Sequence, residues 1–73
     1  MERFILQPSQ EPGFWVATDT ENGVVIKFKD HEFNDTQKVT TLEDEDPEDY
    51  MLMARAMREI GEWLVANHPD KVF

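Results

Sequence analysis

Apolar and polar residues alternate through much of the first half of the chain, and this pattern predicts β-strands. The apolar positions are rich in aromatic and β-branched side chains, which are typical of strands that have one covered face. Turn residues, among them Pro12-Gly13 and Asn22-Gly23, separate the runs. Strands are expected at about residues 3–7, 14–19 and 24–29, and a further short strand at 36–42 would make a fourth.

The connection around Gly23 can be built in two ways, which give the sheet different faces. With a bulge at Gly23, Trp15 lies on the opposite face from Ile26, beside Val25. With a two-residue turn, Trp15 and Asp19 share the face of Ile26, because a slip of one residue turns a whole strand over. The bulged register is favoured because it keeps the Asp19 carboxylate off the core face.

The second half of the chain predicts one helix at about residues 47–66. Asp46 can serve as its N-cap, because its side chain can accept a hydrogen bond from an unpaired backbone amide of the first turn. Pro47 suits the first helical position, where its missing N–H costs nothing. Asn67-His68-Pro69 is expected to end it. On a helical wheel the apolar side is made of Tyr50, Met53, Met57, Ile60, Gly61 and Leu64. The opposite side is made of Arg55, Arg58, Glu59 and Glu62, in which Arg55–Glu59 and Arg58–Glu62 are expected i,i+4 pairs.

These elements predict an α+β fold in which a three- or four-stranded antiparallel sheet, connected as a meander, packs on one C-terminal α-helix. Residues 1–73 are expected to form a single small domain. A chain of this length buries only about 60–65% of its unfolded surface, so its core is thin. The absence of cysteine excludes disulfides and cysteine-bound zinc.

The charge of the chain limits its partners. Its net charge is -9, a field that repels nucleic-acid phosphates and anionic lipids. We therefore expect no direct nucleic-acid or membrane contact, and we expect a basic protein surface or a second copy of the chain as partner. Neither a secretory signal nor an apolar run of about 20 residues is visible, so a cytoplasmic location is expected.

No catalytic, cofactor or metal site is expected from the sequence. Ser9 is the only serine and lies far in sequence from either histidine. Asp30-His31-Glu32 is the only mixed ligand cluster, and neighbouring strand residues would point to opposite faces. The three glycines are scattered and form no phosphate-binding loop.

Two groups of residues are candidates for a partner surface. One is apolar, because the apolar arc of the helix is wider than a small sheet is expected to cover, and because tryptophan is enriched at binding hot spots. The other belongs to an acidic run of six carboxylates in residues 43–49. It is the part of this run that a helix start does not explain. The candidates are Trp15, Val25, Leu52 and Trp63 in the first group, and Glu43, Asp44 and Glu45 in the second.

The chain places a short strand before the segment Pro12-Gly13-Phe14-Trp15-Val16, and further strands and a helix after it. This order resembles that of HicB-type antitoxins. The likeness covers residues 4–19. The mid-chain Pro-Gly turn of that family is missing after Asp19, and no function is carried across.

The functional hypothesis is a non-enzymatic protein-interaction module, bacterial or phage-like in its compactness, that binds itself or a basic protein. A first alternative is a small-ligand-binding or enzymatic domain with a pocket between sheet and helix, lined by Met51, Met53 and Met57. A second alternative is an inhibitor, either antitoxin-like or a nucleic-acid mimic.

Overall fold

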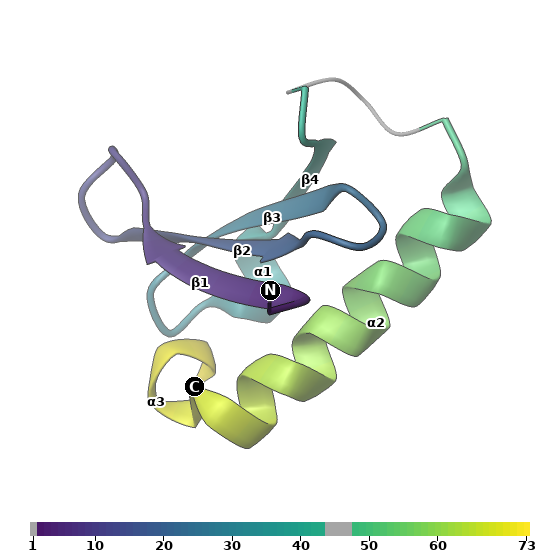
Figure 1. The fold of residues 1–73 in the computed structure, drawn as a ribbon. Helices are drawn as coiled ribbons and strands as arrows, with labels where there is room; N and C mark the ends of the chain where they lie inside the picture. The colour runs from purple at the N-terminus through teal and green to yellow at the C-terminus, as the bar shows by residue number, and fades with distance from the viewer. Residues whose placement is uncertain (1, 44–47) are drawn as a thin grey trace.

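The fold is a four-stranded antiparallel meander with helices on one of its faces (Figure 1). The computed structural model describes residues 2–43 and 48–73. Neighbours in the sequence are neighbours in the sheet, in the order β1-β2-β3-β4. The elements are β1 (Phe4–Pro8), β2 (Phe14–Asp19), β3 (Val24–Lys29), α1 (Phe33–Thr36), β4 (Lys38–Thr41), α2 (Tyr50–Asn67) and α3 (Pro69–Val72). The predicted fold class is confirmed, and so is the fourth strand.

The register between β2 and β3 differs from the one that we favoured. Asp19 pairs with Val24 and Trp15 with Phe28, so Trp15 and Asp19 lie on the same face as Ile26. The bulged register is therefore wrong. The side chains are divided between the two faces of the sheet as the two-residue turn predicts. The loop itself is longer and spans residues 20–23, and Gly23 N–H donates to the Asp19 carbonyl at 2.9 Å. Gly23 has a φ of 69°, which glycine adopts without strain.

The core lies between the sheet and α2. Side chains of β2 and β3 alternate, and the half that faces α2 is buried. Phe28 meets Phe33 edge to face, with ring centroids 5.0 Å apart. The buried apolar residues are Ala17, Val24, Ile26, Phe28, Phe33, Ala56, Ile60, Leu64 and Val72.

The helix α2 begins later than the sequence predicted. Asp49 is its N-cap, and its carboxylate accepts a hydrogen bond from Leu52 N–H at 3.0 Å. The expected cap, Asp46, and Pro47 lie outside the described residues, but Glu48 and Asp49 precede the helix rather than forming its first turn. Because Asp46 and Asp49 both have the chemistry of a cap, the sequence pattern could not choose between them.

The buried side of α2 is also rotated from the predicted one. Tyr50 is 73% exposed, whereas Ala56 is fully buried together with Ile60 and Leu64. Tyr50 lies next to the N-cap, where the helix extends beyond the edge of the small sheet (Figure 1). A helical wheel assumes that a helix is packed against a neighbour along its whole length. Here only the middle and the C-terminal half of α2 are packed in this way.

Two short helices were not predicted. Most residues around Phe33 are polar, a pattern typical of a turn, yet α1 brings Phe33 into the core, where it is 6% exposed. After His68, Pro69 is the first residue of α3, and Val72 is buried. One apolar residue in a four-residue helix produces no periodicity, so sequence patterns cannot detect such elements.

We expect Leu64→Ala to destabilise the fold strongly, because it opens a cavity in a thin core. Such substitutions cost about 2–5 kcal/mol. Val65→Ala on the next position of the same helix is the matched control, because Val65 is 46% exposed. Urea denaturation followed by circular dichroism measures both. Equal losses for the two variants would contradict the assignment of Leu64 to the core.

Candidate functional site

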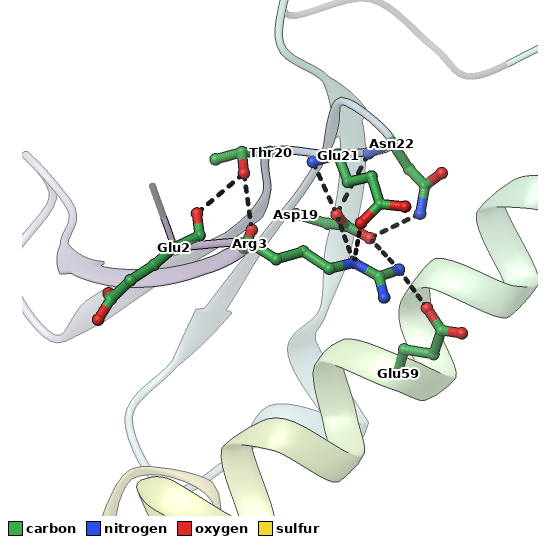
Figure 2. A network of polar contacts seen from close by, with 7 residues as sticks. All are labelled: Glu2, Arg3, Asp19, Thr20, Glu21, Asn22 and Glu59. Carbon is green, nitrogen blue, oxygen red and sulfur yellow. Dashed lines mark hydrogen bonds and ion pairs between the residues drawn. The ribbon is translucent and has the colours of Figure 1, made fainter.

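A buried ion pair joins β1, the β2–β3 loop and α2 (Figure 2). The side chain of Asp19 is fully buried, and it accepts hydrogen bonds from Arg3 Nε at 3.2 Å and Arg3 Nη2 at 3.1 Å. It also accepts from the backbone N–H of Glu21 at 3.0 Å and of Asn22 at 3.2 Å, and from Asn22 Nδ2 at 2.9 Å. Arg3 Nη2 in turn pairs with Glu59 of α2. A buried charge with this many donors is satisfied, which explains why Asp19 can face the core.

The network holds both of its central groups in their charged forms. Burial by itself would raise the pKa of Asp19, but the hydrogen bonds from Arg3 and Asn22 outweigh it and keep the pKa below its ordinary value. The hydrogen bond with Asp19 raises the pKa of Arg3 above its ordinary value. Both groups are therefore charged near neutral pH, and their contacts position α2 against Arg3, the residue that precedes β1.

Glu59 was expected on the solvent side of the helix, paired with Arg55. It faces the sheet and pairs with Arg3 instead. The other expected pair, Arg58 with Glu62, is present at 4.0 Å between two exposed side chains. A helical wheel places Glu59 among polar residues, but it contains no information about Arg3, which is 56 positions away in the chain and pairs with Glu59 in the fold.

The first candidate partner residue, Trp15, points towards the helices. Its Nε1–H donates to Asp30 Oδ1 at 3.1 Å, and Lys71 Nζ lies 4.9 Å from its ring centroid. The ring is half-buried against the core. The expectation that Trp15 lies beside Val25 on the opposite face is therefore wrong, because it depended on the bulged register.

The second candidate, Val25, lies on the face of the sheet that no described helix covers (Figure 1). We call this surface the bare face. Its apolar centre is made by half-buried side chains, and lysines lie on β3 and β4. From the strand registers the bare face consists of Ile5, Gln7, Phe14, Val16, Thr18, Val25, Lys27, Lys29, Lys38 and Thr40.

The charges on the bare face differ from those of the chain as a whole. It carries three of the four lysines, and none of its strand residues is acidic. Lys27 pairs with Glu11 at 2.6 Å and also lies 5.2 Å from the Phe14 ring centroid. Lys29 pairs with Glu32 at 3.4 Å. Both acids lie in loops beside the sheet, so the face has an apolar centre and a lysine border.

The third candidate, Trp63, lies beside the open edge of the sheet. Its ring stacks at an angle on Phe4 of β1, with centroids 5.6 Å apart, and meets His68 edge to face at 5.1 Å. An open hollow of about 470 Å³ lies here, which we call the edge hollow; it is lined by Glu2, Arg3, Phe4, Trp63, Asn67 and His68. Leu52, the fourth candidate, is half-buried near the N-terminus of α2, so the structure does not bring the four together.

The acidic candidates are only partly described. Glu43 is exposed after β4, whereas Asp44 and Glu45 lie outside the described residues. Glu48 and Asp49 are exposed, and Asp49 acts as the cap of α2.

An apolar groove of about 420 Å³ lies between the three helices, and sequence reasoning missed it. Phe33 of α1, Val65 of α2 and Phe73 after α3 contribute to its walls, and Phe73 is 69% exposed. The methionines expected to line a pocket are elsewhere: Met51 is 81% exposed, and Met57 packs against the core. The groove depends on α1 and α3, the two elements that carry no periodic signal.

We expect Asp19→Asn to lower the free energy of unfolding near neutral pH, by about 1.5–3 kcal/mol for lost hydrogen bonds to a charged group. The pKa of Asp19 is depressed in the folded protein, so its contribution is present above the unfolded pKa of about 4 and is lost as the pH falls through the folded value. The stability difference between wild type and variant should thus shrink on acidification.

Urea denaturation at a series of pH values measures this difference. Asp35→Asn, at an exposed carboxylate, is the control and should change stability little. A difference for Asp19→Asn that stays constant down to about pH 2 would contradict the charged pair.

Within residues 2–43 and 48–73, no group of three or more His, Asp or Glu side chains is placed to hold a metal ion. In the same ranges, no helix has the length and apolar character needed to cross a membrane. Comparison with known protein families, with curated proteins and with solved structures found no match.

Proposed function

We propose that this protein is a non-enzymatic protein-interaction module that docks a partner protein on the bare face. The observation that carries the proposal is the position of Val25, Val16 and Phe14 on a sheet face that no described helix covers. Apolar side chains clustered on an exposed face mark interaction sites more often than scattered ones do.

The thin core leaves apolar side chains on the bare face, where a partner could bury them. Burying an exposed Val, Ile or Phe side chain completely contributes about 1.5–3 kcal/mol. Val16, Val25 and Ile5 are already half-buried by their neighbours in the sheet, so each retains only part of that amount. A cluster of such residues gives a partner an apolar centre, and the surrounding polar residues form the rim that interfaces usually have.

The charge of the rim indicates the chemistry of the partner. Lys27, Lys29 and Lys38 border the apolar centre, and no strand residue of the bare face is acidic. Glu11 and Glu32 of the flanking loops pair with the first two lysines, so a partner's carboxylates would share or replace these pairs. A partner surface with apolar residues flanked by carboxylates would complement this border. Such a partner is opposite in sign to the basic one expected from the acidic run. Docking of a basic protein at that run stays a prediction, and so does the cytoplasmic location.

A photo-crosslinking amino acid at position 25 tests the proposal in the host cell. We expect it to capture a defined partner. The same amino acid at position 51 is the control, because Met51 is 81% exposed on α2 and is far from the bare face. Equal capture from both positions would overturn the bare face as the docking surface.

Charge reversal then tests the chemistry of the captured partner. The triple variant Lys27→Glu, Lys29→Glu, Lys38→Glu should weaken its binding by at least about tenfold, and added salt should weaken wild-type binding. Glu43→Lys should leave it unchanged. If Glu43→Lys weakens binding and the triple variant does not, the acidic run is the docking patch and the bare face is not. Thermal unfolding of each variant verifies that the fold is intact.

A further inference from the structure

The outer edge of β1 is open and has the composition of a pairing edge. β1 is the first strand in the sheet order, so among the described residues 2–43 and 48–73 it is paired on one side only, to β2. From Phe4 to Pro8 it contains no ionisable side chain. Edge strands of monomeric proteins usually carry charged residues that prevent pairing with another chain. The opposite edge strand, β4, starts with Lys38, so the two edges differ in charge. β1 ends at Pro8, which has no N–H, so the pairing segment is limited to the residues before it.

The hydrogen bonds to β2 show which backbone groups of β1 point outward. Thr20 N–H donates to the Arg3 carbonyl at 2.8 Å, and Ser9 N–H donates to the Phe14 carbonyl at 2.9 Å. In an antiparallel ladder the bonded residues alternate, so the odd-numbered residues of β1 face β2. The N–H and C=O groups of Phe4 and Leu6 therefore point towards the open edge.

We propose that a second copy of this chain pairs with this edge, antiparallel and about a two-fold axis, with Ile5 opposite Ile5 of the second copy. In this register Phe4 of each copy faces Leu6 of the other. Both outward N–H groups of each copy then meet a carbonyl, which makes the edge self-complementary. A two-fold interface of this kind closes on itself and gives a dimer.

The surroundings of the edge fit a second copy. The edge hollow lies beside β1 on the helix side, where the ring of Trp63 is half-buried against Phe4. Leu6 of the second copy would arrive next to Phe4, and its apolar side chain would extend the cluster that Phe4 and Trp63 begin.

The charges near the edge do not drive the pairing. Two chains of net charge -9 repel each other. β1 adds no charge from Phe4 to Pro8, but the network beside it joins the single cation of Arg3 to the carboxylates of Asp19, Glu21 and Glu59. The free energy of pairing must therefore come from the backbone hydrogen bonds and from the apolar contacts of Phe4 and Leu6.

The paired dimer has a consequence for docking. Strand pairing joins the two sheets into one continuous sheet, so the two bare faces become one larger surface. That surface would present the docking face of the proposed interaction module twice. The dimer itself does not depend on that function and is tested separately from it.

Oligomeric state in solution tests the pairing. Light scattering after size exclusion, over a range of concentrations, should show a dimer for the wild type. Ile5→Glu places two carboxylates opposite each other at the two-fold axis, so its dissociation constant should rise by at least about tenfold. Thr40→Glu adds the same charge to the same face on the other edge strand, and it should leave the dimer unchanged.

Hydrogen exchange gives a second measurement that needs no variant. The outward amides of Phe4 and Leu6 should exchange slowly in the dimer and faster on dilution. A monomeric wild type, equal effects of Ile5→Glu and Thr40→Glu, or fast exchange of these two amides in a dimer would each overturn the proposal. If Val25→Glu dissociates the dimer and Ile5→Glu does not, the copies pack through their bare faces and not through their edges.

Discussion

The hydrogen-bonded pair of Arg3 and Asp19 is the interaction on which the arrangement of this small fold depends. A buried carboxylate costs several kcal/mol unless its oxygens are satisfied, and here an arginine and the amides of the following loop satisfy them. Because Asp19 can lie on the core face, the whole of β2 takes that register, and Trp15 and Ala17 lie on the helix side with it. Through Glu59 the same arginine also ties the first strand to the helix.

The register in turn decides what the opposite face of the sheet presents. Since Trp15 lies on the helix side, the bare face carries Val16 and Phe14 of β2 in its place. Val25 lies on the same face, on the neighbouring strand β3. The large aromatic anchor that the sequence suggested for a partner is thus part of the core rim. What remains outside is a flatter apolar surface bordered by lysines, on a chain whose other surfaces are mainly acidic. The charge of the bare face therefore differs from that of the chain as a whole.

A short chain with one sheet and one long helix leaves two features of the sheet unsatisfied, its second face and its edges. The helices cover one face, and the edge strand β4 carries the charge of Lys38. The bare face and the edge of β1 are adjacent and share Ile5. Pairing of edges and docking on the face would use separate chemistry, backbone hydrogen bonds in one case and apolar burial in the other, so both can occur in one assembly.

The sequence by itself determined the elements that have a local period: three strands and a fourth that is short, the long helix, and the overall charge. It also determined that Ile26 and Leu64 are core residues, because period-two and period-3.6 patterns need no knowledge of the partner element. Only the tertiary structure decided the register of β2, the place of Glu59 and the core role of Phe33. Each of these depends on a partner distant in the chain, as Arg3 is 16 positions from Asp19 and 56 from Glu59. The free energy that makes a buried carboxylate acceptable comes from those partners, and a local pattern does not contain it.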